Sequence, residues 1–168
     1  MGTRKDHWEN IYTELLPRVF NYFRYRINDG SAAEELTSIT FEKAWRARKR
    51  YKKEKGAFST WIFTIARNTG TDYLRKQNET LDIEMVHTSP DSIEENYEKR
   101  EEANHLVEVL SALDHREKEM ISLKYGADLT NRKIAEITGL SETNVGTILH
   151  RTIVKMREAW KEEKDDQR

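Results

Sequence analysis

The chain has 168 residues, of which 35% are charged and 10% aromatic, and its formal net charge is -1. It contains no cysteine, which excludes disulfides, thiolate metal ligands and cysteine nucleophiles. No segment approaches the roughly 20 apolar residues of a membrane span, and the N-terminal residues lack the apolar run of a signal peptide, so we expect a cytoplasmic protein without membrane insertion.

The first part of the chain carries the pattern of three helices. Apolar residues recur there at the three-and-four spacing of one helix face, in runs that glycine-containing turns separate. Pro17 is predicted to kink or divide the first helix, and Ser31 with Glu34 predicts a capping box at the start of the second. The helices are expected over residues 8–27, 31–50 and 58–76, and together they form a first domain, 1–78.

An acidic segment separates this domain from a second helical one. Residues 79–102 hold nine acidic and two basic side chains with few apolar anchors, which is typical of a linker. Helical periodicity returns in residues 103–168, where Asp114 and Glu117 predict another capping box. Because no segment shows a strand pattern, we expect an all-α protein of two small helical domains joined by a flexible acidic linker.

The second domain contains the pattern of a helix-turn-helix. Ala135 is small where two helices cross, Gly139 permits a left-handed turn residue, and Ser141 caps the following helix. Leu140 and Val145 fill the corner between the helices. The second helix is then predicted to place its polar outer face in a DNA major groove. The alternative is an ordinary helical hairpin in a bundle.

A basic segment precedes the third predicted helix. Residues 43–55 hold eight basic side chains against the single acid Glu54, and Phe58 and Trp61 follow closely. Such a mixture is typical of a site for a single nucleic-acid strand. The cations attract the phosphate backbone, and the bases stack on the aromatic rings. The alternative is a solvated helix face with Phe58 and Trp61 in the core, and composition leaves both open.

Three segments resemble a known family. The residues from Ala33 to Arg46 resemble the sigma-factor segment that docks on the clamp helices of RNA polymerase. The residues from Phe58 to Asn68, continued by 72–76, resemble the segment that melts and reads the minus-ten promoter element. Residues 116–151 are similar to the domain that reads the minus-thirty-five element. The matches lie in family order, so the chain resembles sigma factors of the sigma-70 family, extracytoplasmic-function type.

The resemblance implies three binding surfaces and no catalysis, cofactor or metal. Core RNA polymerase is expected at Glu34, Glu35, Ser38 and Glu42. Flipped bases and the backbone of the non-template strand are expected at Lys52, Lys53, Lys55, Phe58, Trp61, Arg67 and Asn68. The minus-thirty-five element is expected at Asn144, Gly146, Thr147, His150 and Arg151. An anti-sigma factor that occludes the polymerase- and DNA-binding faces is also implied.

The sequence departs from the family pattern in both domains. Ser38 and Ile39 stand where the family usually has a glutamine and an acid. Gly146 and Ile148 replace basic residues of the recognition helix, so a bidentate cation contact to guanine is lost at those two positions. The promoter sequence is therefore not predictable.

Two other classes of protein account for less of the sequence. A stand-alone helix-turn-helix regulator accounts for the C-terminal pattern but not for the N-terminal one. An enzyme requires a site, and none of the five histidines lies in a ligand pair or beside a nucleophile motif. The sequence also lacks a phosphate-binding glycine loop. We therefore expect a transcription factor that is not an enzyme.

Overall fold

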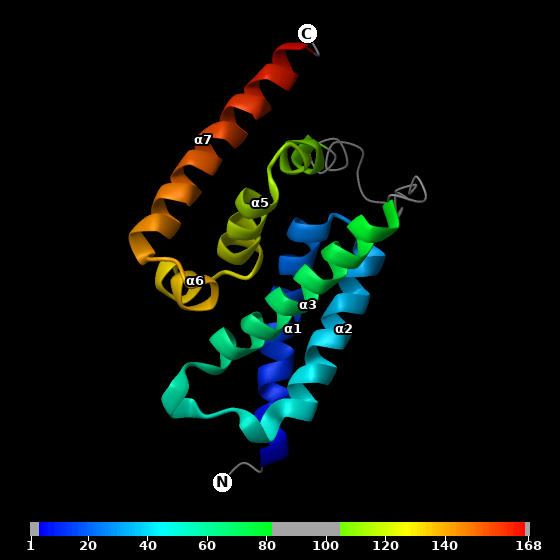
Figure 1. Cartoon of the computed structure of the whole chain (residues 1–168), viewed down its shortest axis with the longest axis vertical. Coiled ribbons are helices and arrows are strands. Elements are labelled where there is room, and N and C mark those ends of the chain that lie inside the picture. The colour runs from blue at the N-terminus through cyan, green and yellow to red at the C-terminus, as the bar shows by residue number, and fades with distance from the viewer. Residues whose placement is uncertain (1–3, 82–104, 167–168) are drawn as a thin grey trace.

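The computed structural model describes residues 4–81 and 105–166, and these ranges contain helices and connecting turns but no strand (Figure 1). This confirms the all-α prediction. The predicted linker 79–102 lies, beyond residue 81, outside the described residues. In chain order the elements are α1 (Arg4–Ile27), α2 (Gly30–Ala47), η1 (Arg48–Arg50), η2 (Lys53–Lys55), α3 (Phe58–Leu81), α5 (His115–Ile121), η3 (Ser122–Gly126), α6 (Asn131–Thr138) and α7 (Glu142–Asp166). Residues 105–111 are also helical.

The first helical unit consists of α1, α2 and α3, which pack their apolar faces together. Val19 and Phe23 of α1 and Ile62 and Phe63 of α3 are completely buried. Each such side chain contributes about 1.5–3 kcal/mol when it is withdrawn from water. Of the two outcomes predicted at Pro17, a kink or a division, the division does not occur, because α1 runs without a break through this residue.

The turn between α1 and α2 also differs from the prediction. The helix α2 begins at Gly30, and its N-cap is Asp29, whose carboxylate accepts a hydrogen bond of 3.1 Å from the Ala32 backbone N–H. Asn28 adopts a left-handed φ of 59°, which reverses the chain within one residue. The capping box predicted at Ser31 therefore does not form. Asp29 is an equally good N-cap residue and lies two positions earlier, so the helix already begins before Ser31.

The second unit contains the predicted helix-turn-helix. Asp114 and Glu117 form the predicted reciprocal capping box at the start of α5. Gly139 ends α6 with a left-handed φ of 76°, and the Ser141 hydroxyl accepts a hydrogen bond of 3.1 Å from the Asn144 backbone N–H. Val145 is completely buried between the helices. The helix-turn-helix prediction is confirmed.

The two units pack directly against each other, which the sequence did not indicate. In Figure 1, α5 and α6 lie alongside the first unit. The Arg18 side chain of α1 donates a hydrogen bond of 2.8 Å to the Ala127 carbonyl. Gly126 lies so close to α1 that a Cβ atom there would be 2.9 Å from the Asn21 carbonyl oxygen. One hydrophobic core therefore continues from one unit into the other.

Candidate nucleic-acid interface

The basic loop, defined here as residues 48–57, connects α2 to α3 and is held by aromatic rings. The Tyr51 hydroxyl donates a hydrogen bond of 3.1 Å across the loop to the Gly56 carbonyl. The Tyr51 ring lies 5.0 Å from the Phe58 ring and 5.3 Å from the Trp61 ring. On the other side, Phe58 contacts Trp8 at 5.1 Å. These edge and tilted ring contacts fix the loop against α1 and α3.

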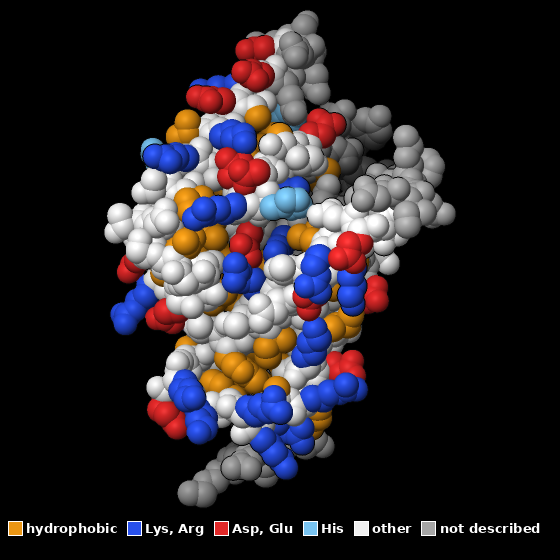
Figure 2. Space-filling view, viewed as in Figure 1, with side chains coloured by type: hydrophobic (Ala, Val, Ile, Leu, Met, Phe, Trp, Pro, Cys, Tyr) orange, Lys and Arg blue, Asp and Glu red, His pale blue; other side chains and the backbone are white. Residues whose placement is uncertain are grey.

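The loop and the first turns of α3 enclose a cavity of about 200 Å³, which we call the loop cavity. Aromatic walls come from Tyr51 and Trp61, and cationic side chains from Lys52 and Lys55. The two lysines are exposed, whereas Trp61 is half-buried. Figure 2 shows Lys and Arg side chains gathered at this end of the molecule. The complete lining is Arg50, Tyr51, Lys52, Lys55, Gly56, Ala57, Thr60, Trp61 and Thr64.

The structure places the predicted minus-ten residues in different environments. Lys53 is exposed on the loop beside Lys52 and Lys55, and Asn68 is exposed on α3. Phe58 is half-buried among three rings, so it anchors the loop and does not line the cavity. Sequence reasoning missed Tyr51 and Thr60, although Tyr51 is an aromatic residue within a basic run, which is a signal that could have identified it.

Arg67 lies at the contact between the two units. Its Nε donates a hydrogen bond of 2.7 Å to the carboxylate of Glu119 on α5. Arg26 of α1 approaches the same carboxylate oxygen at 3.6 Å and donates a hydrogen bond of 2.6 Å to the Tyr22 hydroxyl. Burial raises the pKa of Tyr22 to about 12, and the positive charge of Arg26 opposes this effect. Tyr22 therefore stays protonated at neutral pH.

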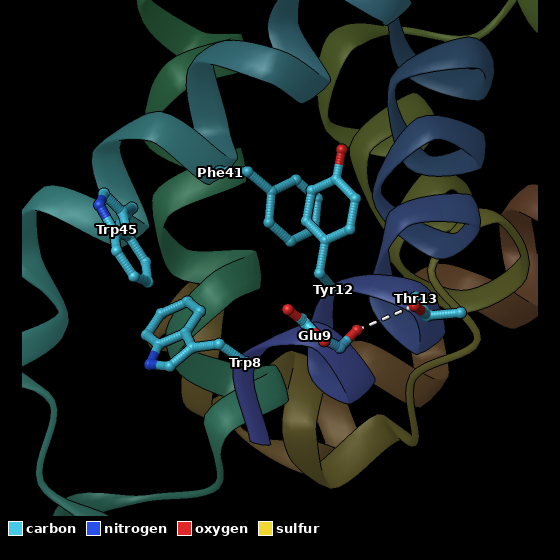
Figure 3. A pocket seen from close by; sticks show the side chains of 6 residues that line it. All are labelled: Trp8, Glu9, Tyr12, Thr13, Phe41 and Trp45. Atoms are coloured by element: carbon cyan, nitrogen blue, oxygen red, sulfur yellow. Dashed lines mark hydrogen bonds between the residues drawn. The ribbon is translucent and has the colours of Figure 1, made fainter. Parts of the chain in front are cut away.

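The four predicted polymerase-binding residues, Glu34, Glu35, Ser38 and Glu42, are all exposed on α2. Beside them, α1 and α2 form an aromatic groove of about 580 Å³, lined by Trp8, Glu9, Tyr12, Thr13, Phe41 and Trp45 (Figure 3). The residues Tyr12 and Trp45 are 47% and 49% exposed, which is unusual for residues with such large rings. The Arg48 guanidinium lies 4.0 Å above the Trp45 ring.

The helix α7, predicted to be the recognition helix, exposes most of its predicted DNA-binding residues to solvent. Asn144, Thr147, His150 and Arg151 are exposed. Gly146 instead is half-buried and faces α6, because a Cβ atom there would lie 3.7 Å from the Asn131 side chain. A cavity of about 340 Å³ brings Arg116 of α5 to the same surface as Asn144 and Arg151. Arg116 was not predicted as a site residue, since its approach to α7 depends on the tertiary fold.

Among residues 4–81 and 105–166, no group of histidine, aspartate and glutamate side chains is arranged to hold a metal ion. None of the helices described there is long and apolar enough to cross a membrane.

Comparison with known proteins gives matches to both units. Residues 11–80 match the model of Sigma-70 region 2, and residues 109–158 match that of Sigma-70, region 4. RNA polymerase sigma factor CarQ of Myxococcus xanthus is 30% identical, over 92% of this chain and 89% of its own length. ECF RNA polymerase sigma factor RpoE of Cereibacter sphaeroides is 29% identical, over 90% of this chain and 86% of its own length. ECF RNA polymerase sigma factor BldN of Streptomyces coelicolor is 27% identical, but the match spans only 58% of its length.

Two solved structures share the fold. The sigma factor RpoE of Bartonella quintana, in complex with the anti-sigma factor NepR, superposes with a TM-score of 0.78 at 20% identity and covers 92% of this chain and 97% of its own. CnrH, in complex with the cytosolic domain of CnrY, gives a TM-score of 0.65 at 19% identity and covers 94% of this chain and 88% of its own.

Proposed function

Because the chain belongs to the sigma-70 family of RNA polymerase sigma factors, as a factor of the extracytoplasmic-function type, we propose that it binds core RNA polymerase and directs initiation at specific promoters. It acts in the cytoplasm, needs no cofactor and contributes no catalytic group. The observation that carries this proposal is one chain with a cationic, aromatic-walled cavity in its first unit and a helix-turn-helix in its second. A stand-alone regulator is not favoured, because that function does not account for the match of residues 11–80 to Sigma-70 region 2.

The loop cavity is the proposed site of minus-ten recognition. A base flipped from the duplex loses its stacking and pairing, and a protein must replace both. Trp61 and Tyr51 offer rings for stacking, while Lys52 and Lys55 at the loop hold the phosphates on either side. Phe58 supports this site by anchoring the loop, and Asn68 and Arg67 extend the contact surface along α3.

The exposed face of α2 is the proposed polymerase contact. Glu42 is exposed on α2 one residue beyond Phe41 of the aromatic groove, and its carboxylate pairs with Arg46 at 2.6 Å. Exposed aromatic residues are typical of the desolvated centre of protein interfaces. We assign this groove to core polymerase as well, with Glu34, Glu35 and Ser38 forming the polar rim. Ser38 cannot supply the charge of an acid, so Glu34 and Glu35 carry more of the electrostatic contact.

The exposed face of α7 is the proposed minus-thirty-five contact. Asn144, Thr147, His150 and Arg151 reach base edges there, and Arg116 adds a cation for the phosphates or a base. Gly146 does not contact a base directly, because its position faces α6. Residues 1–78 and 103–168 thus have separate roles, with 79–102 as the connecting linker. An anti-sigma factor, as in the complexes of RpoE with NepR and of CnrH with CnrY, is the proposed negative regulator.

The first prediction tests the function as a whole. The isolated protein is expected to bind duplex promoter DNA only nonspecifically, with a Kd of roughly 10⁻⁴ to 10⁻⁶ M, because its net charge is near zero and its minus-ten site requires an opened strand. Added core polymerase is expected to produce initiation at defined start sites. Gel-filtration binding to core enzyme, followed by run-off transcription, measures both. A tight, sequence-specific duplex complex without core enzyme contradicts the proposal.

A further inference from the structure

Thr60 lines the loop cavity, and its hydroxyl oxygen is buried without a hydrogen bond to any donor or acceptor among the described residues. A buried polar atom without a partner costs about 1–3 kcal/mol, so native proteins rarely retain one without a function. Thr64, one turn further along α3, differs, because its hydroxyl donates a bond of 2.8 Å to the Thr60 carbonyl.

The local geometry explains why Thr60 has no such partner. A helical threonine usually donates to the carbonyl four residues earlier, as Thr64 does. For Thr60 that carbonyl belongs to Gly56, which lies before the helix with a φ of 155° and a ψ of 167°. The Gly56 carbonyl accepts from the Tyr51 hydroxyl instead. The loop that builds the cavity therefore also leaves the buried Thr60 hydroxyl without a partner in the described part of the protein.

We propose that Thr60 is a specificity-determining residue, whose hydroxyl hydrogen-bonds the edge of the non-template base held in the loop cavity. A nucleobase fits better than a phosphate, because Tyr51 and Trp61 supply apolar walls around Thr60 while the cations of Lys52 and Lys55 lie on the exposed loop. A hydroxyl both donates and accepts hydrogen bonds. Which base it favours therefore depends on whether the pocket presents a donor or an acceptor of the base edge to it. This inference rests on the proposed function.

The test compares isosteric variants in reconstituted holoenzyme. Promoters with a premelted bubble carry each of the four bases in turn at every non-template minus-ten position, and initiation rates are measured. Thr60→Val is expected to reduce the preference at one position by roughly 3- to 10-fold, the effect of one hydrogen bond. Thr60→Ser, which keeps the hydroxyl, is expected to retain the preference. Thr64→Val is the matched control, because its hydroxyl is already bonded to the backbone.

The outcomes separate the inference from the proposed function. A Thr60→Val protein that keeps every base preference overturns the inference, and so does a rate loss that is equal for all bases or an equal effect of Thr64→Val. If wild-type holoenzyme shows no promoter preference at all, the proposed function itself fails. Circular dichroism melting of each variant shows whether its fold is retained, and Thr60→Ala, which also removes the hydroxyl, replaces Thr60→Val in the test if Thr60→Val unfolds.

Discussion

Trp61→Ala is expected to reduce the rate of open-complex formation by roughly 10- to 100-fold, because stacking of one base on an aromatic ring contributes about 1–3 kcal/mol. Trp61 forms a wall of the loop cavity, where it replaces the stacking that a flipped base gives up. The defect is expected to shrink on a promoter whose minus-ten region is already mismatched, since the unpairing cost has then been removed. Fluorescence of a base analogue in the minus-ten region measures the melting rate.

The Trp61 experiment needs a control for folding. The ring is half-buried and lies 5.2 Å from Phe58, so its loss leaves a cavity as well as removing a stacking surface. Trp61→Phe keeps a ring and is expected to melt promoters at a rate closer to wild type. Asn68→Ala changes an exposed residue on the same helix and is expected to impair melting without loss of stability. Normal melting by a folded Asn68→Ala protein would contradict the assignment of α3 to minus-ten recognition.

Features that depend on a few neighbouring residues were predicted well from the sequence. Gly139, Ser141 and Val145 fix the helix-turn-helix through one left-handed residue, one cap and one buried contact, all within seven positions. The capping box at Asp114 is local in the same way. The prediction at Ser31 failed for a reason that is also local, because Asp29 competes for the same role two positions earlier.

Features that join distant parts of the chain were not predicted. Arg67 and Glu119 are 52 positions apart, and neither residue alone indicates that they meet. The loop cavity was predicted only as a basic, aromatic segment, because its shape depends on Tyr51 folding back to Gly56. The half-buried position of Gly146 beside Asn131 was likewise not indicated, since a helical register does not show which face packs against α6. Sequence periodicity defines helix faces, but the partners of those faces come from the tertiary fold.

Arg151→Ala is expected to have the largest effect in the C-terminal unit, with a cost of about 1–3 kcal/mol in discrimination between promoters that have and lack a proper minus-thirty-five element. Arg151 is exposed on α7 and shares a surface with Asn144 and Arg116. A base contact changes preference among sequences, whereas a phosphate contact changes affinity for all sequences equally. Holoenzyme competition assays with wild-type and scrambled minus-thirty-five elements distinguish the two.

The matched control for this prediction is Arg157→Ala, which removes the same charge from the same helix at an exposed position nearly two turns beyond Arg151. It is expected to leave promoter preference unchanged. Asn144→Ala is expected to act like Arg151→Ala, because both side chains line one cavity. Neither change is expected to weaken binding to core polymerase, since the proposed docking surface lies on α2 in the other unit. If Arg151→Ala and Asn144→Ala instead impair only polymerase binding, the roles assigned to the two units are wrong.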